Sequence, residues 1–170
     1  MSIAYRIAQK WIDTSYPTVK CDQFAMPYYA DYSTTMESLY NKLPLRAKKV
    51  LCTGVLHLCS KSTLKAITGS DAVLGFTKPG DGVIYYNLER FVSGEEPLSD
   101  QRFVTLFYHE IGHYLIHNFT DKDKEFYFKK FGTEPVTSGE PEADGFSAYM
   151  CGVAPYHVQE FWSWWALNAV

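Results

Sequence analysis

Two histidines and a glutamate stand within one short stretch, His109-Glu110-Ile111-Gly112-His113. On an α-helix, residues four apart are turned by about 40° and lie about 6 Å apart along the axis, so both imidazoles can reach one ion. Imidazole nitrogens bind Zn²⁺ well, and a carboxylate beside the ion can take a proton from a water molecule. The spacing therefore predicts a zinc site at His109 and His113, with Glu110 as the general base.

The residues around this motif predict a helix that buries one side and turns the other toward a cleft. At about 100° per residue, the apolar positions between 103 and 115 fall in one arc, while His109, His113 and His117 form a separate stripe. Gly112 is costly inside a helix, which indicates that another backbone passes close to it. His117 lies one turn beyond the pair, so we expect it to be partly exposed or to support a ligand.

Two histidines leave a zinc ion incompletely coordinated, so the chain must supply a third ligand and leave one position open. A third histidine in the pattern H-E-x-x-H-x-x-G-x-x-H is excluded, because Ile116 and Phe119 occupy the required positions. The acidic residues Glu140, Glu142 and Asp144, on a predicted following helix, offer the alternative. Glu140 and Glu142 would face about 200° apart on a regular helix, so both cannot easily serve one ion.

The two segments together resemble the ImmA/IrrE family of metallopeptidases. That family has the patterns H-E-x-G-H and E-x-x-A-[N/D]-x-F-A, to which residues 109–113 and 140–148 of this chain are similar. The resemblance is strongest over residues 103–155 and implies Glu140 as the third zinc ligand, with Glu142 as the fallback. It also implies that Asp144 orients a histidine ligand by accepting its other N–H. Ser147 replaces the family's usual Ala, which leaves subfamily and substrate open.

The resemblance implies a zinc-dependent endopeptidase with a zincin-like fold. Its substrate would be a specific protein, such as a transcriptional repressor or another regulator, and an extended substrate is expected to add as a strand along residues 82–87. The alternative is a zinc-containing regulatory module that binds its partner with little or no proteolysis. A further donor must stabilise the oxyanion, and the candidates are Tyr85, Tyr86, Tyr156 and His157.

Composition and charge limit the partners and the compartment. The chain has 170 residues and a formal net charge of -3, which gives no general attraction to nucleic acid. The basic cluster Arg46, Lys48 and Lys49 is interpreted as a solvated helix face. The four cysteines form no C-x-x-C pair, and we find neither a secretory signal nor a run of about 18 apolar residues. We therefore expect a cytoplasmic protein with reduced thiols and no membrane partner.

The helices and strands expected around the motif indicate an α+β fold in one domain, residues 1–170. It is expected to be mostly helical, with a small antiparallel sheet beside the histidine helix. Residues 1–68 are expected to form a helical N-terminal part, with helices over residues 2–14, 33–43 and 45–60. Ser33 or Thr34 would cap the second helix, while the third would carry His57 and stack Cys52 and Cys59 on one face.

Residues 69–170 are expected to hold a β-hairpin, the histidine helix, the third-ligand helix and a C-terminal helix. The hairpin spans residues 72–87 around Pro79-Gly80. The helices are predicted over residues 100–118, capped by Ser99 or Asp100, and over residues 141–151 and 158–167. The charged residues 120–139 predict a mobile loop with at most one helical turn. Three tryptophans are expected in the core: Trp162, Trp164 and Trp165.

Overall fold

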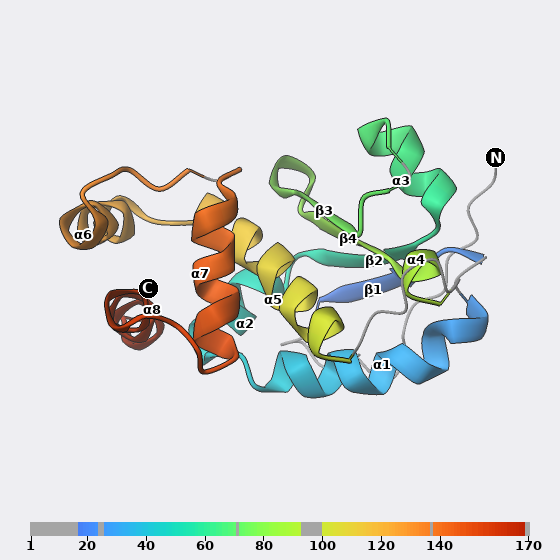
Figure 1. Cartoon of the computed structure of the whole chain (residues 1–170), viewed down its shortest axis with the longest axis horizontal. Helices are drawn as coiled ribbons and strands as arrows, with labels where there is room; N and C mark the ends of the chain where they lie inside the picture. The colour runs from blue at the N-terminus through green and yellow to red at the C-terminus, as the bar shows by residue number, and fades with distance from the viewer. Residues whose placement is uncertain (1–16, 24–25, 71, 93–99, 137, 169–170) are drawn as a thin grey trace.

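The computed structural model contains a mixed sheet of four strands beside the helices that carry the motif (Figure 1). The structure describes residues 17–23, 26–70, 72–92, 100–136 and 138–168. The strands are β1 (Thr18–Cys21), β2 (Val55–Cys59), β3 (Gly75–Lys78) and β4 (Val83–Asn87). Their order is β1-β2-β4-β3, with β1, β2 and β4 parallel and β3 antiparallel to β4. The described chain is therefore α+β, with helix as its larger part.

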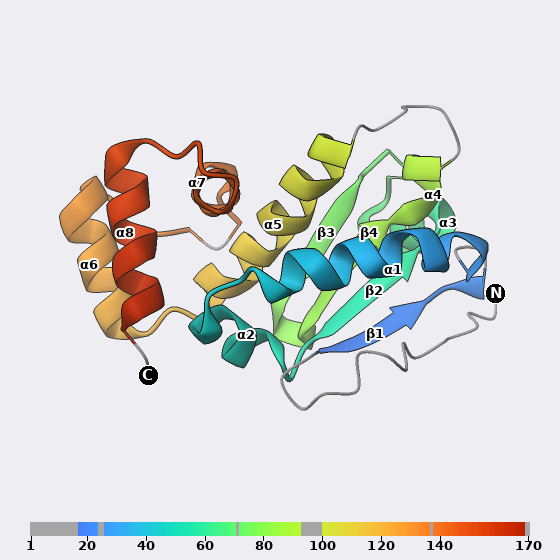
Figure 2. The same ribbon diagram turned by 90° about the horizontal axis from the view of Figure 1, so that it is seen from below.

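The helices surround this sheet and extend beyond it on one side (Figures 1 and 2). Their bounds are α1 (Met26–Asn41), α2 (Leu45–Leu51), α3 (Lys61–Thr68), α4 (Leu88–Val92), α5 (Asp100–His117), α6 (Asp121–Phe131), α7 (Glu140–Met150) and α8 (Tyr156–Leu167). Helices α1 and α5 lie on one face of the sheet and α3 on the other, while α7 separates α5 from α6 and α8. Among the described helices, none has both the length and the apolar character that crossing a membrane requires.

The apolar face of α5 packs against both the sheet and α1. Tyr86 of β4 donates a hydrogen bond to the carbonyl oxygen of Phe107 (2.9 Å), and Tyr108 donates one to the carbonyl oxygen of Leu39 in α1 (2.8 Å). Each fully buried apolar side chain contributes roughly 1.5–3 kcal/mol. The helical spacing correctly predicts six buried residues of α5, whereas Ile116 is buried although it lies outside the predicted arc and Val104 is only partly buried. The six are Phe103, Phe107, Tyr108, Ile111, Tyr114 and Leu115. Their burial fixes the rotation of α5, so the histidine stripe faces α7.

The expected antiparallel sheet is wrong for β1 and β2, which lie in the part predicted to be helical. Residues 45–60 form a helix only as far as Leu51, and the run from Val55 to Cys59 is a buried strand between β1 and β4. A parallel strand covered on both faces is apolar throughout, and periodicity alone cannot separate such a short run from a helix. Consequently Cys52 and Cys59 do not share a helix face, and His57 belongs to a strand.

Several predicted helix limits also change. Helix α1 begins at Met26, so Ser33 and Thr34 lie inside it rather than at its cap. Helix α7 begins at Glu140, with Gly139 as its N-cap, and α8 begins at Tyr156. The hairpin and α5 are confirmed, while the predicted helix over residues 2–14 and the candidate cap Ser99 lie outside the described residues. Propensity patterns locate helices better than they locate helix ends.

The predicted mobile loop over residues 120–139 is wrong, because its first half forms α6. The helix begins with a capping box: Asp123 donates its backbone N–H to the Thr120 hydroxyl (3.2 Å), and its carboxylate accepts the Thr120 N–H (2.9 Å). Such a box stabilises a helix start by satisfying two free donors. Apart from the buried Asp123, the charged side chains of α6 lie on its exposed face.

Arg46 is buried rather than part of a solvated face. Its guanidinium donates hydrogen bonds to the Asp123 carboxylate (2.7 Å) and to the Trp165 carbonyl oxygen (2.9 Å), and lies 4.4 Å from the centre of the Trp165 ring. These contacts tie α2 to α6 and α8. Trp162 and Trp165 are buried as predicted, and Trp164 is partly buried. Removing one partner of such a buried ion pair is strongly destabilising.

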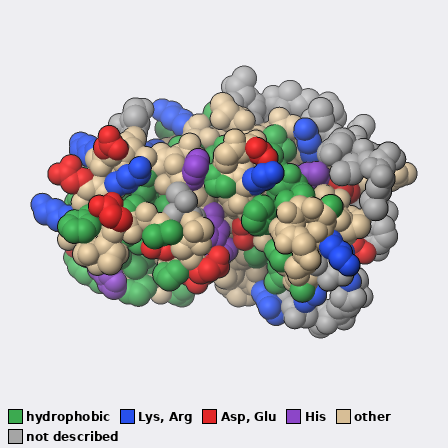
Figure 3. Space-filling model, turned by 90° about the horizontal axis from the view of Figure 1, so that it is seen from above, with side chains coloured by type: hydrophobic (Ala, Val, Ile, Leu, Met, Phe, Trp, Pro, Cys, Tyr) green, Lys and Arg blue, Asp and Glu red, His purple; other side chains and the backbone are tan. Residues whose placement is uncertain are grey.

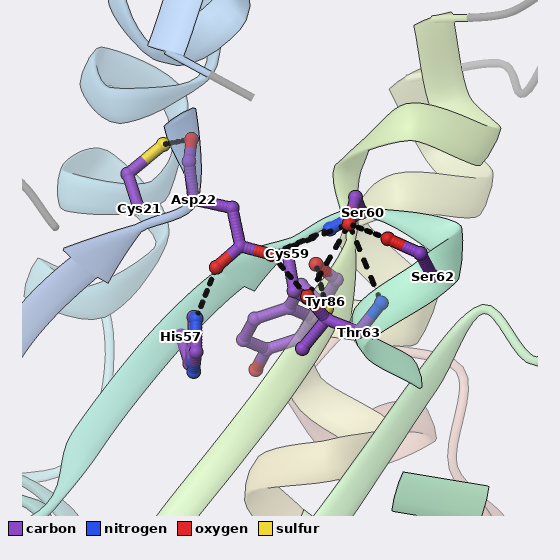
Figure 4. A network of polar contacts seen from close by, with 8 residues as sticks. All are labelled: Cys21, Asp22, His57, Cys59, Ser60, Ser62, Thr63 and Tyr86. Atoms are coloured by element: carbon purple, nitrogen blue, oxygen red, sulfur yellow. Dashed lines mark hydrogen bonds and ion pairs between the residues drawn. The ribbon is translucent and has the colours of Figure 1, made fainter. Parts of the chain in front are cut away.

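A buried polar network joins the ends of β1 and β2 to the start of α3 (Figure 4). The Asp22 carboxylate accepts hydrogen bonds from His57 Nε2 (2.7 Å), the Thr63 hydroxyl (2.6 Å) and the Ser60 backbone N–H (3.0 Å). Burial alone would raise the pKa of Asp22, but these hydrogen bonds outweigh burial and hold that pKa below its ordinary value of 3.8. The charged form of Asp22 therefore stabilises the sheet edge that carries β1.

Replacing Asp22 by alanine is expected to lower the free energy of unfolding by about 3 kcal/mol near pH 7, because the buried donors of His57, Ser60 and Thr63 lose their shared acceptor. Since the folded pKa lies below the unfolded one, this stabilisation is complete above about pH 5 and is lost as the pH falls through the folded pKa. Urea unfolding between pH 7 and pH 3 measures both effects. The exposed Asp81 provides the control, and a similar loss in Asp81→Ala contradicts this account.

Candidate metal centre

His109 and His113 project from α5 toward a common point. Their Nε2 atoms lie 3.2 Å apart, and their ring planes cross at 88° with the centroids 4.8 Å apart. On a tetrahedral ion with bonds of about 2.0–2.1 Å, two nitrogen ligands stand about 3.3 Å apart. The two imidazoles therefore have the separation that shared ligation of one ion requires.

Glu140, the first residue of α7, completes this cluster from the facing helix. Its Oε2 lies 2.9 Å from His109 Nε2, and its Oε1 lies 3.3 Å from His113 Nε2. Among the described residues, His109, His113 and Glu140 form a group that could hold a metal ion, with ligand atoms within 4.8 Å of one another. Two imidazoles and one carboxylate match a zinc site that keeps one position open. The structure thus brings together the three ligands predicted from the sequence.

Asp144 lies beside His109, one turn after Glu140 on α7. Its Oδ1 is 2.7 Å from His109 Nδ1. A carboxylate at that nitrogen favours the tautomer with the proton on Nδ1, which leaves the Nε2 lone pair free for a metal. This is the supporting position that the resemblance implies for Asp144.

Glu110 is buried beside the two histidines. Its side chain is 7% exposed, and its Oε2 lies 4.0 Å from His109 Nε2. Burial raises the pKa of Glu110 above its ordinary value of 4.5, while a hydrogen bond from Thr77 and the neighbouring histidines oppose this rise. A carboxylate in such surroundings is a candidate proton acceptor.

A cleft of about 210 Å³ opens onto Glu110, His113 and Glu140. The cleft is also lined by strand β3, by the turn after it and by Ser138. In the space-filling view, histidine and acidic side chains come to the surface together on one face of the molecule (Figure 3). The sequence did not identify the remaining lining residues, because only the fold brings them to the motif: Gly75, Phe76, Thr77, Pro79 and Ser138.

Glu142, the alternative third ligand, does not join the histidines. Its Oε2 is buried against Gly139 and has no hydrogen-bond partner among the described residues, and Glu142 does not belong to the group of candidate metal ligands. The structure thus agrees with the prediction that Glu140 and Glu142 cannot serve one ion. Glu140 takes the ligand position because it is the first residue of α7, which packs closely against α5 at Gly112. A Cβ added at Gly112 would lie 3.1 Å from the Cα of Ala143 in α7.

The two tyrosines of β4 do not line the cleft. Tyr86 is fully buried, and its hydroxyl donates to the carbonyl oxygen of Phe107, which occupies its only proton. Tyr85 points to the other face of the strand, where its ring lies 5.0 Å from that of His57. Strand side chains alternate between faces, so the run of two tyrosines cannot direct both toward α5. Neither is positioned to stabilise an oxyanion.

The other two oxyanion candidates, Tyr156 and His157, lie outside the cleft as well. Tyr156 is 74% exposed and hydrogen-bonded to Glu160, and the His157 ring packs 5.4 Å from that of Phe131 on α6. His117 is exposed near the end of α5 and is absent from the metal-ligand group. The side chains of Tyr156 and His157 could donate a hydrogen bond to an oxyanion, but they do not lie at the cleft.

No family model, curated protein or solved structure matches this chain.

Proposed function

We propose that this chain is a zinc-dependent endopeptidase with a zincin-like arrangement of its site. The observation that carries the proposal is the convergence of His109 Nε2, His113 Nε2 and the two Glu140 carboxylate oxygens, each oxygen 2.9–3.3 Å from one imidazole, next to a buried Glu110. Nitrogen and carboxylate ligands in a set of three favour zinc among the common catalytic ions. When bound, zinc would act as a Lewis acid on a peptide carbonyl and on a water molecule.

Two further residues of the chain have separate roles in the proposed reaction. Asp144 holds His109 in the tautomer that can bind, while Glu110 accepts a proton from the attacking water and passes it to the leaving amine. The buried surroundings of Glu110 strengthen its electrostatic interactions compared with those in bulk water. This arrangement supports hydrolysis of an amide bond by direct attack of water.

A substrate strand would have to bind along β3 rather than along residues 82–87. Strand β4 pairs with β2 on one side and β3 on the other, so it has no free edge. Strand β3 is the last in the sheet order of the described chain, and it also borders the cleft. An extended peptide can add to such an edge through backbone hydrogen bonds. That the peptide belongs to a transcriptional repressor or another regulator rests on the family resemblance alone.

Zinc affinity tests the ligand assignment. Glu140→Ala is expected to weaken zinc binding by more than about 100-fold, and Asp144→Ala by about 10- to 100-fold, since the first removes a ligand and the second its support. Glu142→Ala is the matched control, expected within about twofold of wild type because that side chain does not belong to the group of candidate metal ligands. Competition with a chromophoric zinc chelator measures all three constants. Equal losses in Glu140→Ala and Glu142→Ala would refute the site.

Cleavage tests the activity itself. Zinc-loaded wild-type protein, incubated with a peptide library prepared from a whole proteome, is expected to generate new peptide termini that share a sequence preference. Mass spectrometry identifies them, and apoprotein treated with a chelator is the control. Protein that binds zinc at His109, His113 and Glu140 but generates no new termini would overturn the endopeptidase proposal.

A further inference from the structure

Strand β3 contacts the proposed general base directly. The Thr77 hydroxyl lies 2.7 Å from Glu110 Oε1 and 2.9 Å from the Glu110 backbone carbonyl oxygen. A hydroxyl has one proton, so it donates to one of these two acceptors at a time. The nearby second acceptor lets Thr77 keep a partner whether or not the carboxylate is charged.

Gly75 adjoins the same side chain from two positions earlier on β3. A Cβ at Gly75 would lie 2.9 Å from Glu110 Cγ and 3.2 Å from both Cδ and Oε2. Contacts that short require the neighbour to move, and the displaced group would be the Glu110 carboxylate itself. Because residues two apart on a strand face the same side, Gly75 and Thr77 act on Glu110 together.

The two contacts distinguish the carboxylate oxygens of Glu110. Oε1 receives the Thr77 hydrogen bond, whereas Oε2 lies toward the histidine pair, 4.0 Å from His109 Nε2. We propose that Thr77 and Gly75 are positioning residues that hold Glu110 so that Oε2 is the oxygen that accepts the proton of the attacking water. This inference rests on the proposed function. It adds that strand β3 holds the general base Glu110 in place, besides offering its edge to the substrate.

Acetohydroxamate binding to the zinc-loaded protein tests the proposal without a substrate. A hydroxamic acid that chelates an ion passes its proton to a nearby base, so its affinity reports whether Oε2 is available and oriented. Thr77→Val is expected to weaken acetohydroxamate about tenfold, because Oε2 is then no longer held toward the histidine pair, where the proton of the hydroxamic acid arrives. Gly75→Ala is expected to weaken it at least as much. Zinc affinity should stay within about twofold of wild type in both variants.

Two matched substitutions separate positioning from structure. Thr77→Ser keeps the hydroxyl and should restore wild-type acetohydroxamate affinity within about twofold. Thr105→Val removes a hydroxyl on the exposed side of α5, where it donates to the Gln101 carbonyl oxygen, and should change nothing at the site. Wild-type acetohydroxamate affinity in Thr77→Val, together with a loss in Glu110→Gln, would overturn the positioning role.

Thermal unfolding of the metal-free protein tests the Thr77–Glu110 hydrogen bond independently of catalysis. Thr77→Val is expected to lower the melting temperature by about 3–6 °C in the wild-type background and by clearly less in the Glu110→Ala background, since the partner is then already missing. Equal losses in both backgrounds would overturn the inference. A wild-type protein that binds no zinc would instead refute the proposed function, while the melting comparison would still judge the Thr77–Glu110 contact.

Discussion

Replacing Glu110 by glutamine is expected to reduce hydrolysis by about 100- to 10,000-fold while leaving zinc bound. Glutamine has nearly the same shape and can still accept the hydrogen bond from Thr77 through its Oε1. It cannot accept a proton from water at neutral pH, so the loss falls on the chemical step rather than on the fold. Because Glu110 does not belong to the group of three ligands, the ion should remain in place.

The measurement compares wild type and Glu110→Gln on the cleavage sites found in the peptide library, with zinc content determined on the same samples. A protein partner captured by the wild type should stay bound to the variant and remain uncut. Unchanged biological function in Glu110→Gln, with the partner still bound, would instead support the alternative of a zinc-containing binding module.

The centre of the site could be predicted from the sequence because its geometry is local. His109 and His113 lie four apart on one helix, so helical rotation alone brings their imidazoles together. The prediction of Glu140 as the third ligand depended on the family resemblance, since the sequence alone does not say how α7 packs against α5. The preference for Glu140 over Glu142 agrees with the structure, in which Glu140 but not Glu142 belongs to the group of candidate metal ligands.

The walls of the site could not be predicted, because strand order is a long-range property. The β-rich pattern predicts the hairpin over residues 72–87, but the sequence predicts a helix where β2 lies and no strand where β1 lies. Only their parallel pairing makes β4 an interior strand and leaves β3 at the edge, where Thr77 meets Glu110. A single short apolar run carries no information about its neighbours in a sheet.

Buried charge was the second source of error. Arg46 stands in a basic cluster that resembles a solvated surface, yet it pairs with Asp123, far away in the sequence. Asp22 and His57 likewise have no local feature that connects them, although they form a buried pair. Long polar side chains are usually exposed, so a sequence argument assigns them to the surface unless the partner is known.

Gly112 is expected to control the distance between α5 and α7, and with it the metal centre. A Cβ added there would lie 3.1 Å from both the Cα and the carbonyl oxygen of Ala143, and 3.2 Å from the Cβ of Phe146. Backbone atoms of a packed helix cannot turn aside as a flexible side chain can. Gly112→Ala should therefore shift α7 away from α5 and carry Glu140 away from the two histidines.

The expected result is a loss of zinc affinity of at least about tenfold, because a metal site tolerates deviations of only about 0.2 Å in its ligand distances. The free energy of unfolding should also fall, by up to about 2 kcal/mol, since crowding costs about 1–3 kcal/mol and the helix-propensity gain offsets about 1 kcal/mol of this. Chelator competition and urea unfolding measure the two quantities.

Gly145→Ala makes the same chemical change on α7 and serves as the control. Its added Cβ would lie 3.4 Å from Val158 Cγ1 and 3.9 Å from Trp162 Nε1, which is ordinary packing. We expect zinc affinity to stay at the wild-type value and stability to rise by up to about 1 kcal/mol. If Gly112→Ala also binds zinc like the wild type, the α5–α7 approach does not set the ligand geometry, and Glu140 must reach the histidines through freedom of its own side chain.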